Sequence, residues 1–155
     1  MDQVMQILTI MTLIPMMVSD YRCRRVSAYQ MYLFLLSTIC FAVASNGLKL
    51  CLMNIAGNFM IILVLFVFVT LYFKIRTGFY ASILGSIGMG DVMFFIALLP
   101  LYSMMEYLCL IIVASLVSLL VWIIDGLVHR QTDTIPLITT AGIVYTIYSL
   151  LEFML

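Results

Sequence analysis

An unbroken apolar run, Ile61-Ile62-Leu63-Val64-Leu65-Phe66-Val67-Phe68-Val69, lies near the middle of this chain. It belongs to a longer apolar segment, about Ile55 to Phe73, which ends at Lys74. A continuous apolar run of about 20 residues can cross the roughly 30 Å hydrocarbon core of a bilayer as a helix. A half-buried strand would instead alternate apolar and polar residues. The segment therefore predicts a transmembrane helix.

The composition extends this prediction to the whole chain. Of 155 residues, 66% are hydrophobic and 9% are charged, whereas soluble domains have roughly 45–50% apolar and about 25% charged residues. A soluble fold of this length could not bury so much apolar surface, so the folded chain contacts the lipid bilayer. Only helices and closed barrels satisfy their backbone in lipid, and continuous apolar runs favour helices. The predicted fold class is an all-α polytopic membrane protein.

Charged residues and glycines divide the chain into about six predicted transmembrane helices. No internal repeat or low-complexity linker separates them, so residues 1–155 are predicted to form a single domain. The fourth segment is short, with only about a dozen apolar residues, which is less than a bilayer requires. The predicted segments are about Val4–Val18, Ala28–Ala44, Ile55–Phe73, a short one from Asp91, Tyr107–Ile124 and Ile135–Leu151.

The basic residues predict the orientation of these segments. Of the 7 Lys and Arg residues, all except Lys49 fall in alternate loops of the six-segment arrangement. Lys and Arg accumulate in cytoplasmic loops. Both termini are therefore predicted to be extracytoplasmic, with the first, third and fifth loops in the cytoplasm.

Two aspartates stand at the ends of predicted spans. Asp20 ends the first apolar segment, and Asp91 follows Gly88-Met89-Gly90 and opens a run without another charge until Glu106. Because an ionised carboxylate near the bilayer is costly, such an acid is a functional candidate. The predicted topology places both acids on the cytoplasmic side. The alternative is that Asp20 is an interfacial residue paired with Arg24, and Asp91 an ordinary helix cap.

Two carboxylates that share one proton could perform aspartyl hydrolysis. Their mutual repulsion splits their titration, so that one acts as an acid and the other as a base. The base takes a proton from water, which attacks the peptide carbonyl, and the acid protonates the leaving amine. This chemistry requires neither a metal nor a cofactor.

The glycines before Asp91 allow two local structures. In the first, Gly85 to Gly90 form a bend that lines an aqueous pocket, with Gly90 at positive φ and Asp91 at the pocket floor. In the second, one helix runs from Ala81 to Tyr102, and small residues spaced by four, ending at Gly90, let a neighbouring helix approach. The sequence leaves both open.

Three motifs resemble a known family. Gly88-Met89-Gly90-Asp91-Val92 resembles the GxGD signature of intramembrane aspartyl proteases, specifically the prepilin peptidase branch. The stretch from Ser19 to Ser27, an aspartate followed by basic residues, resembles the first motif of that branch. Thr134-Ile135-Pro136-Leu137, followed by Ala141-Gly142, is similar to its last span, which opens with Ile-Pro. Order and separation match over essentially the whole chain.

The resemblance implies a membrane aspartyl endopeptidase with Asp20 and Asp91 as the catalytic pair. It implies structural or substrate-binding roles for Gly88, Gly90 and Pro136, with no metal and no cofactor. The implied partner is a prepilin or pseudopilin-like protein, whose short basic leader is cut at the cytoplasmic face of the inner membrane. The zero net charge and the lack of a basic arm argue against a nucleic-acid partner.

The chain departs from that family at three points. Val26-Ser27-Ala28 lacks the usual Pro-Asn, and Met93 stands where the family usually has lysine. Both departures bear on substrate fit and leave the acids in place. These 155 residues contain no segment that resembles the methylating extension of bifunctional members or its paired cysteines. The chain therefore resembles the stand-alone peptidases, and methylation is not expected.

The remaining polar residues suggest less. Asp125 and Asp133, expected in the loop before the last span, could attract a basic leader or could simply be solvated. His129 has no accompanying ligands, and the four cysteines include no CxxC pair, so no metal site is predicted.

Two other functions fit a chain of this class. A small proton-coupled transporter could use Asp91 as its carrier, although transporters often show internal repeats and broken helices in both halves. A catalytically idle membrane scaffold is the third possibility.

Overall fold

The computed structural model describes residues 2–23, 26–77, 89–128 and 137–154, and the regular elements in these ranges are helices. The all-α prediction is therefore confirmed. Three helices carry an apolar stretch long enough to cross a membrane, and the last helix is apolar but shorter. In chain order the helices are α1 (Asp2–Cys23), α2 (Ala28–Thr77), α4 (Met89–Leu98), α5 (Met104–Val128) and α6 (Leu137–Met154).

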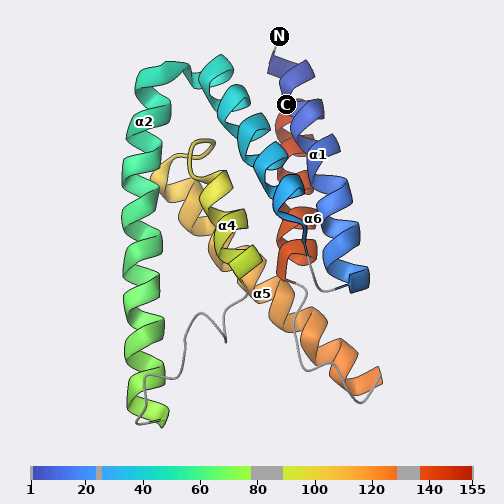
Figure 1. Ribbon diagram of the computed structural model, residues 1–155, viewed down its shortest axis with the longest axis vertical. Helices are drawn as coiled ribbons and strands as arrows, with labels where there is room; N and C mark the ends of the chain where they lie inside the picture. The colour runs from blue at the N-terminus through green and yellow to red at the C-terminus, as the bar shows by residue number, and fades with distance from the viewer. Residues whose placement is uncertain (1, 24–25, 78–88, 129–136, 155) are drawn as a thin grey trace.

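The long helix α2 consists of two helices joined at Gly47. This glycine has φ 76° and ψ 161°, a backbone conformation that is almost restricted to glycine. The two halves run in opposite directions along the long axis of the molecule (Figure 1). The sequence predicted a break across Ser45 to Lys49, and the structure confines the change of direction to one residue within continuous helix.

The positive φ of Gly47 predicts that a side chain at this position destabilises the fold. Gly47→Ala should lower the free energy of unfolding by about 1–3 kcal/mol, because an L-residue is strained in this conformation. A Cβ added at Gly47 or at Gly57 would have no heavy atom within 4 Å, so packing is equally open at both positions. Gly57→Ala is therefore the matched control, and it should be neutral or stabilising by up to about 1 kcal/mol. Thermal unfolding in detergent measures both, and equal shifts in Tm would contradict the prediction.

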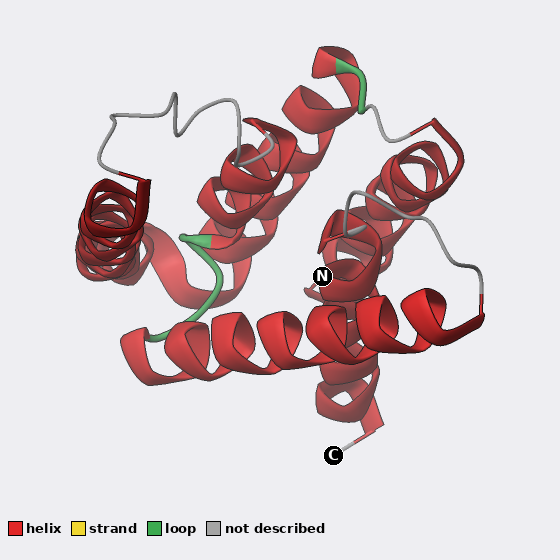
Figure 2. Ribbon diagram, turned by 90° about the horizontal axis from the view of Figure 1, so that it is seen from below, coloured by secondary structure: helices red, strands yellow, loops and turns green. Residues whose placement is uncertain are grey.

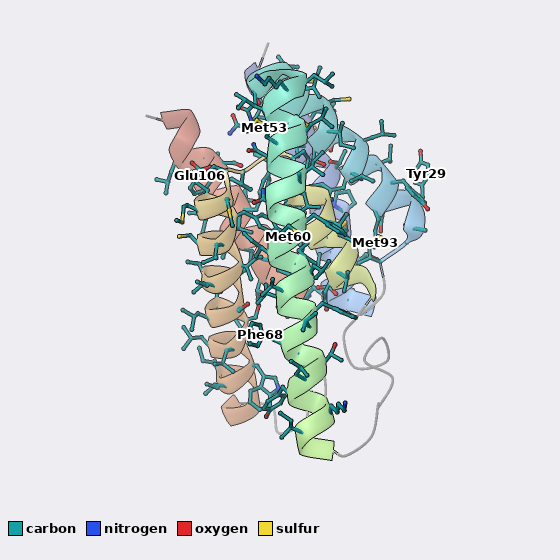
Figure 3. All side chains as sticks on the ribbon, turned by 90° about the vertical axis from the view of Figure 1, so that its left-hand side faces the viewer. Tyr29, Met53, Met60, Phe68, Met93 and Glu106 are labelled. Atoms are coloured by element: carbon teal, nitrogen blue, oxygen red, sulfur yellow. The ribbon has the colours of Figure 1, made fainter. Side chains whose placement is uncertain are left out.

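The second half of α2 presents an apolar surface to the surroundings. Met53, Met60 and Phe68 are between 57% and 66% exposed and point away from the other helices (Figure 3). Large contiguous apolar surfaces are rare on monomeric soluble proteins. This outward face therefore supports a bilayer as the solvent of the folded chain.

The short helix α4 packs between α2 and α6. Phe94 of α4 stacks on Phe34 of α2, with ring centroids 5.6 Å apart and planes 4° apart. Phe34 in turn meets Tyr145 of α6 edge-on at 6.4 Å. All three rings are buried, and such aromatic pairs stabilise a core beyond the area that they bury. The ten residues of α4 span only about 15 Å, so neighbouring helices cover much of it.

Buried hydrogen bonds fix the carboxyl end of α4. Asn58 of α2 donates from Nδ2 to the carbonyl of Leu99 at 2.9 Å and to that of Tyr102 at 2.7 Å. The helix stops at Leu98 because Pro100 lacks an N–H group and restricts the residue before it. A single helix reaching Tyr102 is therefore wrong at its carboxyl end. Its amino-terminal half falls on 81–88, outside the described residues.

The directions of the helices define two ends of the molecule. Both termini lie at one end of the long axis, whereas α1 ends, α4 begins and α6 begins toward the other end (Figure 1). Figure 2 views the molecule along this axis and shows the described elements as helices. Contacts join α1 to α6 and α4 to α6. The two predicted acids, at the end of α1 and at the start of α4, therefore lie toward the same end.

Candidate active site

Asp20 is held by the first turn of the last helix. Its side chain is only 8% exposed, and its oxygen Oδ2 accepts two hydrogen bonds from Thr139. One comes from the backbone N–H at 3.0 Å and the other from the hydroxyl Oγ1 at 2.8 Å. The first N–H groups of a helix have no partner within the helix and bind acceptors readily. The amino end of α6 thus supplies the donors that a buried carboxylate requires.

Asp91 occupies the first turn of α4 and is partly buried. Its charge and that of Asp20 are close enough to interact. Like charges at such a separation repel each other. Tertiary packing thus brings the two acids together from opposite halves of the sequence.

Gly90 lies within α4, immediately before Asp91. Gly47 is the one glycine with positive φ in the described part of the chain, so the expectation of positive φ at Gly90 is wrong. What Gly90 provides is close approach: a Cβ there would lie 3.2 Å from Cδ1 of Ile138 on α6. Of the two roles considered for Gly90, the structure supports the close approach of a neighbouring helix, because a side chain at this position would press on α6.

A second glycine brings α6 against α1. A Cβ at Gly142 would lie 2.8 Å from both Cγ and Sδ of Met17, so only glycine fits without a shift of that side chain. Met17 is one turn before Asp20, and Thr139 is one turn before Gly142. This tight crossing therefore sets the distance between Thr139 and the acid that it binds.

Several predicted positions cannot be placed at this site. Gly88, Pro136, His129 and Asp133 lie outside the described residues. Asp125, expected in a loop, belongs to α5 instead, because that helix extends to Val128. Among the described residues, no group of three or more His, Cys, Asp or Glu side chains is placed to hold a metal ion.

The predicted aqueous pocket also falls partly on residues outside the described ranges. A separate cavity of about 330 Å³ lies at the other end of the bundle, and neither aspartate lines it. Its lining includes Ser45, Ser103 and Ser149, so these three residues share that end.

No sequence motif marked Thr139, Ile138 or Met17 as part of the site. A signal existed for the first of these, because Thr139 and Thr140 interrupt the apolar residues at the start of the last span. Short polar side chains in the first helical turn often bind nearby groups rather than face lipid. Their partner, however, could not be read from a local pattern.

Compared with known proteins, the chain matches no family model, no curated protein and no solved structure. Its function is therefore inferred from its own residues and geometry.

Proposed function

We propose that this chain is a membrane-embedded aspartyl endopeptidase that uses Asp20 and Asp91 as a catalytic pair. One observation carries the proposal: two carboxylates from different helices lie within electrostatic reach of each other, toward one end of an apolar helical bundle. Two acids near a bilayer are costly to keep ionised, so such positions are functional candidates. The resemblance of three sequence motifs to the prepilin peptidases supports the same assignment.

The proposed reaction is hydrolysis of one peptide bond. A water molecule forms a bond from its oxygen to the carbonyl carbon, and one aspartate accepts its proton. The other aspartate gives a proton to the leaving nitrogen as the C–N bond breaks. The products are a new carboxyl terminus and a new amine. The pair finishes with one shared proton, as it began, so no metal or cofactor takes part.

The proposed substrate is a prepilin-like or pseudopilin protein, with a short basic leader followed by an apolar helix. The apolar helix of such a substrate sits in the bilayer, so the junction with the leader lies at the membrane boundary. Asp20 and Asp91 stand at helix ends, which is the depth that this junction would occupy. The negative charge of two acids would also attract a basic leader.

We further propose six spans, with both termini extracytoplasmic and the acid pair facing the cytoplasm in the inner membrane. The two halves of α2 count as separate spans, and the short α4 completes the number. Arg22 and Lys74 lie near the ends of α1 and α2 that point away from the termini. Their position supports a cytoplasmic assignment for that end.

Cysteine labelling tests this orientation. In a background without the four native cysteines, Ser45→Cys and Ser103→Cys should react with an impermeant thiol reagent in intact cells, whereas Thr77→Cys should react only after lysis. Ser45 and Ser103 are exposed and line the same cavity, and Thr77 ends α2 at the opposite end. Labelling of Thr77→Cys but not of Ser45→Cys in intact cells would reverse the topology.

The proposed activity is tested with purified chain in proteoliposomes that also contain a prepilin-type substrate. Mass spectrometry should detect both the released basic leader and the shortened substrate with a new amino terminus. The Asp91→Asn variant, reconstituted at the same density, should release neither product. An intact substrate after prolonged incubation with the unsubstituted chain would refute the proposal.

A further inference from the structure

We infer that Thr139 is a positioning residue for Asp20, an inference that rests on the proposed endopeptidase function. Thr139 holds Oδ2 of Asp20 and so leaves Oδ1 as the oxygen that exchanges protons during hydrolysis. Thr139 itself touches neither water nor substrate in this scheme. It acts through the acid alone.

The two carboxylate oxygens of Asp20 have different hydrogen-bonding surroundings. The backbone N–H and the hydroxyl of Thr139 lie 3.0 Å and 2.8 Å from Oδ2. The hydroxyl also lies 3.2 Å from the carbonyl oxygen of Met17, and the shorter distance favours donation of its single proton to Oδ2. Oδ1 accepts no hydrogen bond from the described part of the chain. Rotation about the last side-chain torsion of an aspartate is otherwise broad, so two donors on one oxygen fix the plane of the carboxyl group.

This arrangement suits both protonation states that hydrolysis requires. The backbone N–H of Thr139 can only donate, and it points at Oδ2, so a proton added to the carboxyl group is favoured on Oδ1. In the ionised form and in that neutral form alike, Oδ2 remains an acceptor. The hydrogen bonds from Thr139 therefore persist while Asp20 gains or loses its proton, and the site needs no rearrangement between the two halves of the reaction.

A second threonine of the same helix shows what an uninvolved hydroxyl does there. Thr146 donates from Oγ1 to the carbonyl of Gly142 at 2.8 Å, within its own helix. It is partly buried, as Thr139 is. Thr146→Val therefore removes a hydroxyl from α6 without touching the acid, which makes it a matched control for Thr139→Val.

The experiment compares Thr139→Val, Thr139→Ser and Thr146→Val in the proteoliposome cleavage assay, per folded molecule. Valine keeps the shape and the backbone N–H of threonine and removes only the hydroxyl. Loss of a hydrogen bond to a charged group should lower kcat roughly 10- to 100-fold. KM should stay within about twofold, because Thr139 does not bind substrate. Thr139→Ser restores the hydroxyl and should recover most of kcat, and Thr146→Val should match the unsubstituted chain.

Two outcomes overturn the inference, and they are distinguishable from failure of the proposed function. If Asp20→Asn abolishes cleavage while Thr139→Val keeps full kcat, the pair is catalytic but Thr139 does not position it. If Thr139→Ser is as impaired as Thr139→Val, the hydroxyl is not the active group. Should Thr139→Val fold poorly, Thr139→Ala gives a second hydroxyl-free variant for the same comparison.

A thermal-unfolding cycle separates the contact from the chemistry. Thr139→Val and Asp20→Ala should each lower Tm, and the double variant should fall by less than the sum, because the two residues share hydrogen bonds. Additive shifts would refute the contact itself. If the unsubstituted chain cuts nothing, the proposed function and the catalytic role of Thr139 both fail, even where the cycle confirms the contact.

Discussion

Asp20→Asn and Asp91→Asn should each lower cleavage of a prepilin-type substrate by roughly 10²- to 10⁴-fold, the range that one general acid or base contributes. An amide has nearly the shape of the carboxyl group and cannot accept a proton from water or donate one to the leaving amine. Each single variant should therefore be as inactive as the double variant, because the pair works as a unit.

The substitutions should leave the fold in place. In Asp20→Asn the amide oxygen can still accept from Thr139, so the contact between α1 and α6 survives in weaker form. Glu106→Gln is the matched control for an acid-to-amide change. Glu106 is exposed in the first turn of α5, near the cavity at the end of the bundle where the termini lie, and accepts a hydrogen bond from the Ser103 N–H at 2.9 Å. A glutamine keeps that bond.

Activity and folded fraction are measured on the same preparations, by product release in proteoliposomes and by size-exclusion chromatography in detergent. Glu106→Gln should cleave at the unsubstituted rate. If either aspartate variant keeps more than about a tenth of the turnover, that residue is not one of the catalytic acids.

Gly90→Val should lower activity by roughly 10²-fold, although it changes no ionisable group. A Cβ at position 90 would already lie 3.2 Å from Cδ1 of Ile138, and the two methyl groups of valine add further bulk. Overpacking of this kind typically costs about 1–3 kcal/mol and pushes α4 away from α6. Asp91 follows directly, so it moves relative to Asp20, and a displacement of about 1 Å can cost about 10²-fold in rate.

Two companion variants identify the cause. Gly90→Ala should have a small effect, because the methyl end of Ile138 can move by a few tenths of an ångström. Ile138→Val removes Cδ1, the atom in contact, and should make Gly90→Ala indistinguishable from glycine at this position. Cleavage per folded molecule is compared across the set. Normal activity in Gly90→Val would show that the close approach of α4 to α6 does not set the acid geometry.

Features that depend on local composition could be predicted from the sequence. The all-α class follows from continuous apolar runs, because lipid leaves the backbone few alternatives. The break in α2 was predicted from the polar residues and the glycine that follow Ala44. The shortness of α4 was predicted from the small number of apolar residues after Asp91. The helices extend beyond the predicted apolar segments: α1 continues to Cys23 rather than ending at Val18, and the second half of α2 begins directly after Gly47 rather than at Ile55. The number of spans and their orientation stay predictions from the distribution of basic residues.

Other predictions failed where packing outweighed local propensity. For Gly90 the sequence left open a bend with positive φ and a close approach to a neighbouring helix. Gly90 is helical and lies against Ile138 of α6, so at this residue the close approach is the alternative that the structure supports. Asp125 was expected in a loop because it is charged, whereas α5 continues through it to Val128. In both cases the residue type permitted two structures, and a neighbouring element selected one.

The sequence by itself determined that the chain is helical and apolar enough for a membrane. It also identified Asp20 and Asp91 as functional candidates, because an ionised carboxylate near a bilayer is energetically unfavourable. Those properties depend on residues that are neighbours in the sequence, so they can be predicted from the sequence. Only the tertiary structure decided that the first turn of α6 meets the last turn of α1, and that Thr139 holds Asp20. Hydrogen bonds between distant segments depend on how closely helices cross. Here that distance depends on Gly90 and Gly142, because a glycine has no side chain to hold the neighbouring helix away. The local sequence does not show which residues these glycines contact.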